Sequence, residues 1–179
     1  MTLRGIATRM VLALCLAVGI AAQTAFVSPP AMAAADDANA VVRVVSAFYR
    51  NYIEAHRHFD GKKMDYDFRK QPEVDASFVQ KIDKLIADAQ KSEFGALEYD
   101  PILMAQDVPV GMKYAKPVIK ESSAKLIAYT LWGGGPEHAI CVSLAKKDSG
   151  WHITDVTDIE TEKMKQECGG TKAKGKAQK

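Results

Sequence analysis

Asp100 and Asp107 are the two carboxylates whose spacing could support acid–base chemistry. They flank the segment Pro-Ile-Leu-Met-Ala-Gln (101–106), and an aspartate before a proline is typical of the start of a capped short helix. If the segment is helical, its two turns separate the carboxylates by about 10 Å along the axis, which is wide for a shared proton. The alternative is that Asp100 caps the helix and Asp107, after Gln106, hydrogen-bonds backbone amides at its end. Asp100 and Gln106 are therefore candidates for lining a ligand pocket on this connector.

The histidines and the glycine run do not make up a cofactor site. His138 and His152 are expected on adjacent strands, where a pair can bind a metal, but no third ligand lies nearby in the sequence. Polar, partly exposed strand residues are the simpler interpretation. Gly133-Gly134-Gly135-Pro136 is followed by a strand and not by the helix whose amides would bind a phosphate. The sequence therefore predicts neither a metal nor a cofactor.

The first 33 residues have the pattern of a secretory signal peptide. Arg4 and Arg9 precede an apolar run over 10–22, which is short for a membrane span. Ala31-Met32-Ala33 has the small-x-small form that signal peptidase reads, so we expect cleavage before Ala34. Export to the periplasm or out of the cell follows, with no transmembrane span in the mature chain. The alternative is an uncleaved anchor.

Cys141 and Cys168 remain after this cleavage, and an even number of cysteines in an exported protein permits one disulfide. The bridge would tie the C-terminal segment to a strand and, for a 27-residue separation, stabilise the fold by ~3 kcal/mol. The alternative is two unpaired thiols, with Cys141 a small buried residue.

The charge divides the rest of the chain into a mildly acidic domain and a basic end. Residues 34–162 carry 16 basic and 21 acidic side chains, whereas residues 163–179 carry six lysines and one acid. The folded part shows no basic footprint of the kind that binds nucleic acid. We expect 163–179 to be a disordered lysine-rich tail, which could alternatively be attracted to an anionic membrane surface.

Hydrophobic periodicity predicts two helices, a short third one at 102–105, and then four strands. Val41, Val45, Phe48 and Tyr52 recur at helical spacing, and a second helix follows with Pro72 in its first turn. The strands are expected at 112–119, 124–132, 138–146 and 151–159, with a bulge near Asp155. The prediction is one α+β domain over 34–162, with two to three helices packed on a curved antiparallel four-stranded sheet.

The aspartate-flanked segment 100–107 and the closing Gly-Trp-His-Ile-Thr-Asp-Val (150–156) resemble a bacterial family of exported proteins, the domain of unknown function DUF3828. The resemblance covers roughly residues 40–160. It is similar in plan to the wider NTF2-like group, in which a curved antiparallel sheet wraps around helices to form a cone. The resemblance implies export and this NTF2-like cone, but no activity and no functional residues.

NTF2-like enzymes use acids, tyrosine or histidine inside the cone, and the local candidates for such a role in this chain are Asp107, Tyr129 and His152. Trp132, beside the glycine run, is the aromatic side chain expected at the edge of a pocket. Because the sequence carries no nucleophile, metal or cofactor signature, we predict a non-catalytic exported binding or protein-interaction module. An inhibitor or immunity protein is one form of it, and its partner would be a protein or a small apolar ligand. The alternative is a small isomerase, dehydratase or hydrolase that uses those three residues.

Overall fold

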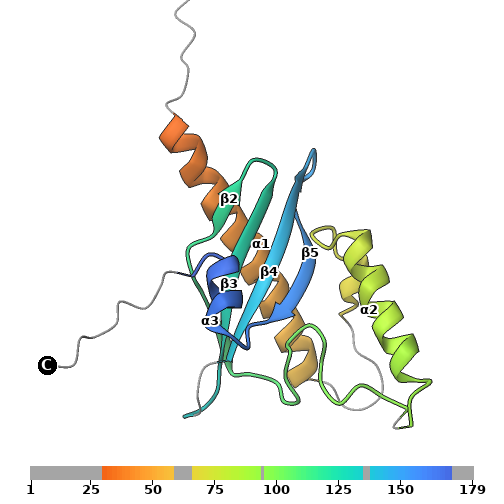
Figure 1. Ribbon diagram of the computed structural model, residues 1–179. Helices are drawn as coiled ribbons and strands as arrows, with labels where there is room; N and C mark the ends of the chain where they lie inside the picture. Colours follow the sequence, from red (N-terminus) through yellow and green to blue (C-terminus); the bar gives the residue numbers. More distant parts are fainter. Residues whose placement is uncertain (1–29, 59–65, 94, 135–137, 171–179) are drawn as a thin grey trace, which may run out of the picture.

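The structure is a computed structural model that describes residues 30–58, 66–93, 95–134 and 138–170. This part of the chain contains three α-helices and a curved antiparallel sheet of five strands (Figure 1). The predicted α+β class, with helices packed on a curved antiparallel sheet, is confirmed. No helix within the described ranges is both long and apolar enough to cross a membrane. Most of the predicted signal peptide, residues 1–29, lies outside them.

Three long strands form the centre of the sheet. They are β3 (Ser123–Leu131), β4 (His138–Lys147) and β5 (Gly150–Asp158), paired in that order. Leu144 lies opposite Ile153 while Ser143 lies opposite Asp155, so Thr154 is an extra residue in β5. The bulge predicted near Asp155 is confirmed.

The first predicted strand is divided in two, which is why the sheet has five strands and not the predicted four. β1 (Gly111–Tyr114) and β2 (Val118–Lys120) both pair with β3. Tyr114 lies opposite Ala128 and Val118 lies opposite Lys125, so residues 115–117 face only two residues of β3. This is a bulge, and Pro117, which has no backbone N–H to donate, lies within it.

Helix α1 (Pro30–Arg57) crosses one face of the sheet (Figure 1). Its helical repeat buries one stripe of side chains against the alternate apolar positions of β3, β4 and β5. Asp37 lies within this helix and does not cap it. Instead the two carboxylate oxygens of Asp37 accept hydrogen bonds from Lys146 Nζ at 2.6 and 2.8 Å. The buried stripe of α1 consists of Val41, Val45, Phe48, Tyr49, Tyr52 and Ile53.

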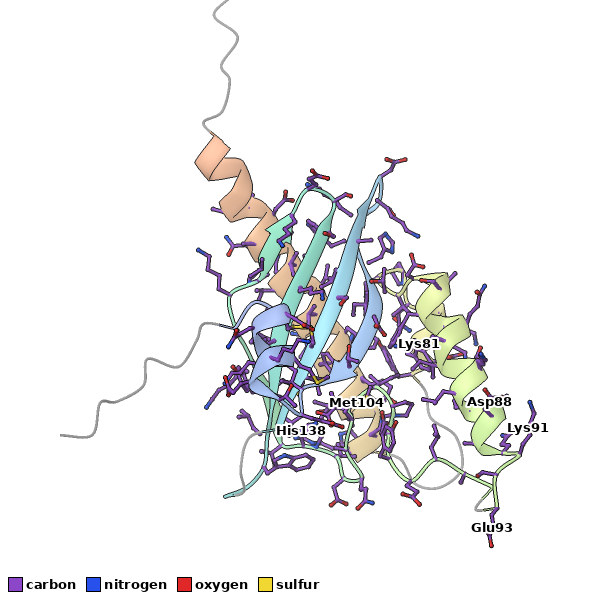
Figure 2. All side chains as sticks on the ribbon, in the orientation of Figure 1. Lys81, Asp88, Lys91, Glu93, Met104 and His138 are labelled. Atoms are coloured by element: carbon purple, nitrogen blue, oxygen red, sulfur yellow. A yellow bond between two sulfur atoms is a disulfide. The ribbon has the colours of Figure 1, made fainter. Side chains whose placement is uncertain are left out.

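Helix α2 (Ala76–Ala89) lies beside the edge of β5, after a short 3-10 helix, η1 (Phe68–Lys70). It begins after Asp75, which caps it, and not at Pro72 as predicted. The reason is that 73–75 pair with β5: Ile153 donates to the carbonyl of Glu73 and accepts from the amide of Asp75. Lys81, on the side of α2 that faces the sheet, forms an ion pair with Asp155 (Figure 2).

The other face of the sheet carries α3 (Glu162–Glu167), held by a disulfide between Cys141 of β4 and Cys168. The predicted bridge is confirmed (Figure 2). Residues 162–170 are therefore part of the fold, and the domain extends beyond the boundary predicted at 162. The last part of the predicted tail, residues 171–179, lies outside the described residues.

Candidate functional site

The fold does not bring Tyr129 and His152 together. Tyr129 lies opposite Ala139 of β4, whereas His152 lies opposite Ala145. These two partners are six residues apart on one strand, which corresponds to roughly 20 Å. The two side chains therefore cannot act on the same small substrate.

The remaining predicted site residues other than Asp100 lie toward the surface. Gln106 and Asp107 are exposed, in the connector that leads to β1, and Trp132 is half-buried just after β3. None of the three lines the cavity that opens beside α1 and α2.

Asp100, in contrast, joins the connector to α1. Its Oδ1 accepts from the backbone amides of Ile102 and Leu103 at 2.7 and 2.9 Å, and its Oδ2 accepts from Tyr52 Oη at 2.7 Å. The predicted short helix at 102–105 is wrong: the segment forms a turn closed by a hydrogen bond from the Asp100 amide to the Ala105 carbonyl, and Asp100 accepts from the amides of this turn and caps no helix. Burial, followed by the Asp100 charge, raises the pKa of Tyr52 well above its usual value, so its hydroxyl remains a donor. Both carboxylate oxygens of Asp100 therefore already accept hydrogen bonds from within the fold.

His56 completes this cluster from the last turn of α1. Its Nδ1 lies 2.9 Å from the carbonyl oxygen of Tyr52, and its Nε2 lies 3.5 Å from Asp100 Oδ2. Its ring packs on that of Tyr52 with centroids 4.2 Å apart. Sequence reasoning missed this histidine as a partner of Asp100; the available signal was its spacing of four from Tyr52 on the stripe that α1 buries.

A cavity of about 480 Å³ lies beside this cluster, between α1, η1, α2 and the turn after Asp100. Its volume is within the range of small-molecule sites, and most of its lining is aromatic or aliphatic. The hydroxyl of Tyr66, one of the lining residues, is buried and has no hydrogen-bond partner among the described residues. The cavity could hold a small apolar molecule. Its lining includes Tyr52, His56, Tyr66, Phe68, Ile82 and Ile102.

The connector over residues 95–110 presents apolar side chains to solvent. Tyr99, Val108 and Val110 are 42%, 36% and 61% exposed, and they are three of the four large apolar side chains found exposed among the described residues. The connector is also fixed: Arg57 donates to the carbonyl of Pro109 at 2.9 Å, and the Val110 amide donates to Leu131 at 2.8 Å.

The outer edge of β1 is open. Ala115 donates to Ile127 at 2.9 Å, so in this antiparallel pair the odd-numbered residues of β1 bond to β3. The backbone groups of Met112 and Tyr114 therefore point away from β3. No loop or second strand in the described part of the chain bonds to them.

Two hollows lie between α1 and the edge formed by β1 and β2, and we call them together the β1 groove. One, of about 270 Å³, is lined by residues that include Arg50, Arg57 and Met112. The other, of about 650 Å³, is lined by Val42, Lys116, Pro117 and further residues. Tyr114 lines both, so the two hollows follow each other along the strand.

In the described ranges, His, Cys, Asp and Glu side chains form no cluster of three or more that could hold a metal ion.

Comparison with known proteins leaves the chain without an assigned family. No family model matches the sequence, and no curated protein matches it. Among solved structures, the chain is similar to one in the crystal structure of the type VI SeMet effector-immunity complex Tae3-Tai3 from Ralstonia pickettii. The match has 16% identity and a TM-score of 0.45, and covers 66% of this chain and 97% of that chain. A match at this level assigns neither a fold family nor a function.

Proposed function

We propose that this chain is a non-catalytic, exported binding module whose partner is a protein. The observation that carries the proposal is the fixed connector, which holds Tyr99, Val108 and Val110 exposed on a backbone bonded to both α1 and β3. Apolar side chains on a preorganised surface are suited to burial in a protein interface, because little conformational entropy is lost on binding.

The contacts of the acid–base candidates favour binding over catalysis. Both oxygens of Asp100 accept hydrogen bonds from the fold, and Tyr129 and His152 lie far apart along the sheet. An acid–base enzyme needs such groups within reach of one substrate.

The proposed setting is the periplasm, with the chain as a member of the DUF3828 family and an enzyme of the cell envelope as the partner it inhibits or neutralises. Two features support this setting. The N-terminal residues have the signal-peptide pattern, and the Cys141–Cys168 disulfide suits an oxidising compartment.

Site-specific photo-crosslinking tests the proposal. The full-length chain is expressed in its source organism with p-benzoylphenylalanine in place of Val110, or in place of Lys91 as the control. Lys91 lies at the end of α2 that points away from the sheet (Figure 2). We expect illumination to give one adduct of discrete mass from position 110 and none from position 91. No adduct from position 110, or the same products from both positions, would contradict a protein partner at the connector.

A further inference from the structure

We propose that the β1 groove accepts an extended, acidic segment of the partner protein, which adds to the sheet as a strand beside β1. This inference rests on the proposed function and specifies how the partner binds.

The backbone of β1 is available for such an addition. Met112 and Tyr114 direct their N–H and C=O groups outward, and these groups have no bond to another described segment. An added strand would pair with these two residues, and its main-chain hydrogen bonds would provide affinity that does not depend on its sequence.

The hollows on either side of Tyr114 are placed to receive side chains of the added strand. Alternate residues of a strand point to the same side at intervals of about 7 Å, and the two hollows follow each other along the edge. Burial raises the pKa of Tyr114 to about 12, so its hydroxyl remains protonated and can donate to a carboxylate. Segments whose side chains fit these hollows and hydrogen-bond to their lining would bind more tightly than other extended segments.

The bulge limits the length of the paired region. Residues 115–117 interrupt the edge, and Pro117 has no N–H to offer. The added strand is therefore expected to be short and to pair only along 111–114.

The charge of the groove selects an acidic segment. Arg50, Arg57 and Lys116 line it, and Glu54 is the one acidic side chain among its described lining residues. Arg50 and Lys116 form no ion pair with another described residue, so their charges are available to a partner. A second copy of this chain would bring the same cations to the edge, and the two sets of like charges would repel each other. An acidic partner is therefore favoured over pairing between two copies.

The test uses two changes in the chain that carries the cross-linker at position 110. Met112→Pro removes an outward N–H without breaking a bond to β3, and the pair Arg50→Glu and Lys116→Glu reverses the groove charge. Matched controls are Met112→Leu and the pair of exposed changes Lys84→Glu in α2 and Lys91→Glu just after it. Both test variants should lower the adduct yield roughly fivefold or more, with the controls unchanged. Thermal unfolding confirms that each variant folds.

The outcomes distinguish the two proposals. If the adduct forms at full yield in folded Met112→Pro and in the charge-reversed variant, the strand addition is wrong while the binding module stands. An adduct of twice the chain's mass identifies a second copy and also overturns the inference. The absence of any adduct from position 110 would contradict the proposal that the chain is a binding module.

If Met112→Pro does not fold, a synthetic peptide added to the purified wild-type chain tests the same inference. A nine-residue peptide of alternating threonine and glutamate is added to the mature chain, with a lysine-for-glutamate peptide as the control. The glutamate peptide should slow hydrogen exchange of the Met112 and Tyr114 amides roughly tenfold, and the lysine peptide should not. Equal effects, or none, would contradict an acidic strand at this edge.

Discussion

Three aspartates join segments of this chain that are distant in sequence. Asp37 of α1 accepts from Lys146, near the end of β4, and Asp100 accepts from Tyr52 of α1. Asp75 forms an ion pair with Lys147 and also caps α2 through the amide of Ser77. Each carboxylate links two separate segments of the chain, and hydrogen bonds to a charged group are stronger than those between neutral groups. Single residues of this kind therefore set how the helices sit on the sheet.

The Asp75 ion pair predicts a pH-dependent stability. The Lys147 ammonium, helped by the Ser77 hydroxyl and amide, lowers the pKa of Asp75 well below its usual value. Because the folded-state pKa is depressed, the stabilisation is present above the unfolded value of about 3.9 and is lost as the pH falls below it. Asp75→Asn should lower the free energy of unfolding by about 1–2 kcal/mol at pH 7, and by less below about pH 4.

Urea unfolding of both proteins at pH 7 and pH 3 measures this difference. The control is Asp148→Asn, an exposed residue in the same hairpin as Lys147, which should change the free energy of unfolding little at either pH. A difference for Asp75→Asn that is equal at both pH values would contradict the assigned ion pair.

At the scale of elements, α3 is held on the sheet by a disulfide at its C-terminal end and by close packing of the residue that follows. The disulfide joins Cys168 to Cys141 of β4, and the next residue, Gly169, packs against Val118 of β2. A helix of six residues is too short to be stable alone, so these contacts must hold it.

Gly169→Ala should therefore destabilise the protein more than Gly134→Ala, although the two glycines have nearly the same φ. Gly169 has φ +98°, and an added Cβ would overlap Val118 Cγ2 and lie 3.1 Å from Val118 Cβ. Gly134 has φ +97°, and no heavy atom of the described residues lies within 4 Å of an added Cβ, so Gly134→Ala isolates the backbone cost. We expect an extra loss of ~1–2 kcal/mol at Gly169, measured by denaturant unfolding.

Val118→Ala provides the cross-check, because it removes the methyl groups that the new Cβ would meet. In the Gly169→Ala background it should recover much of that extra loss. Equal losses for the two glycine variants, with no recovery, would show that Gly169 does not pack against β2 as described.

At the scale of the whole molecule, the connector and the β1 groove form one continuous region. Val110, the most exposed of the apolar connector residues, directly precedes Gly111, the first residue of β1. A partner that buries Val110 is therefore already beside the open edge. This continuity is the reason that one cross-linking position can report on both proposals.

A further prediction at this scale is export, with cleavage of the N-terminal residues. Intact mass of the protein from the periplasmic fraction should correspond to a chain that starts at Ala34, and a thiol assay on it should find no free cysteine, since Cys141 and Cys168 are bonded. Ala33→Arg should block the cleavage and leave the longer chain. A periplasmic protein that retains residues 1–33, or a cytoplasmic one with two free thiols, would contradict the signal-peptide interpretation.

Features with a local cause could be predicted from the sequence. The apolar stripe of α1 follows from helical spacing, the bulge at Thr154 from a break in strand alternation, and the hydrogen bonds from nearby amides to Asp100 from the proline that follows it. Each of these features depends on residues that lie only a few positions apart in the sequence. The α+β class follows from the order of such elements.

Which distant residues meet depends on packing, which no local pattern contains. Tyr52 and Asp100 are 48 positions apart and meet because α1 buries the face that carries Tyr52. Tyr129 and His152 are separated because the register of β3, β4 and β5 places them at different levels of the sheet. The register of β1 and β2 on β3 divides the first strand at Pro117 and points the backbone N–H and C=O groups of Met112 and Tyr114 outward. The candidate binding edge is thus a property of strand pairing, which is set when the sheet assembles.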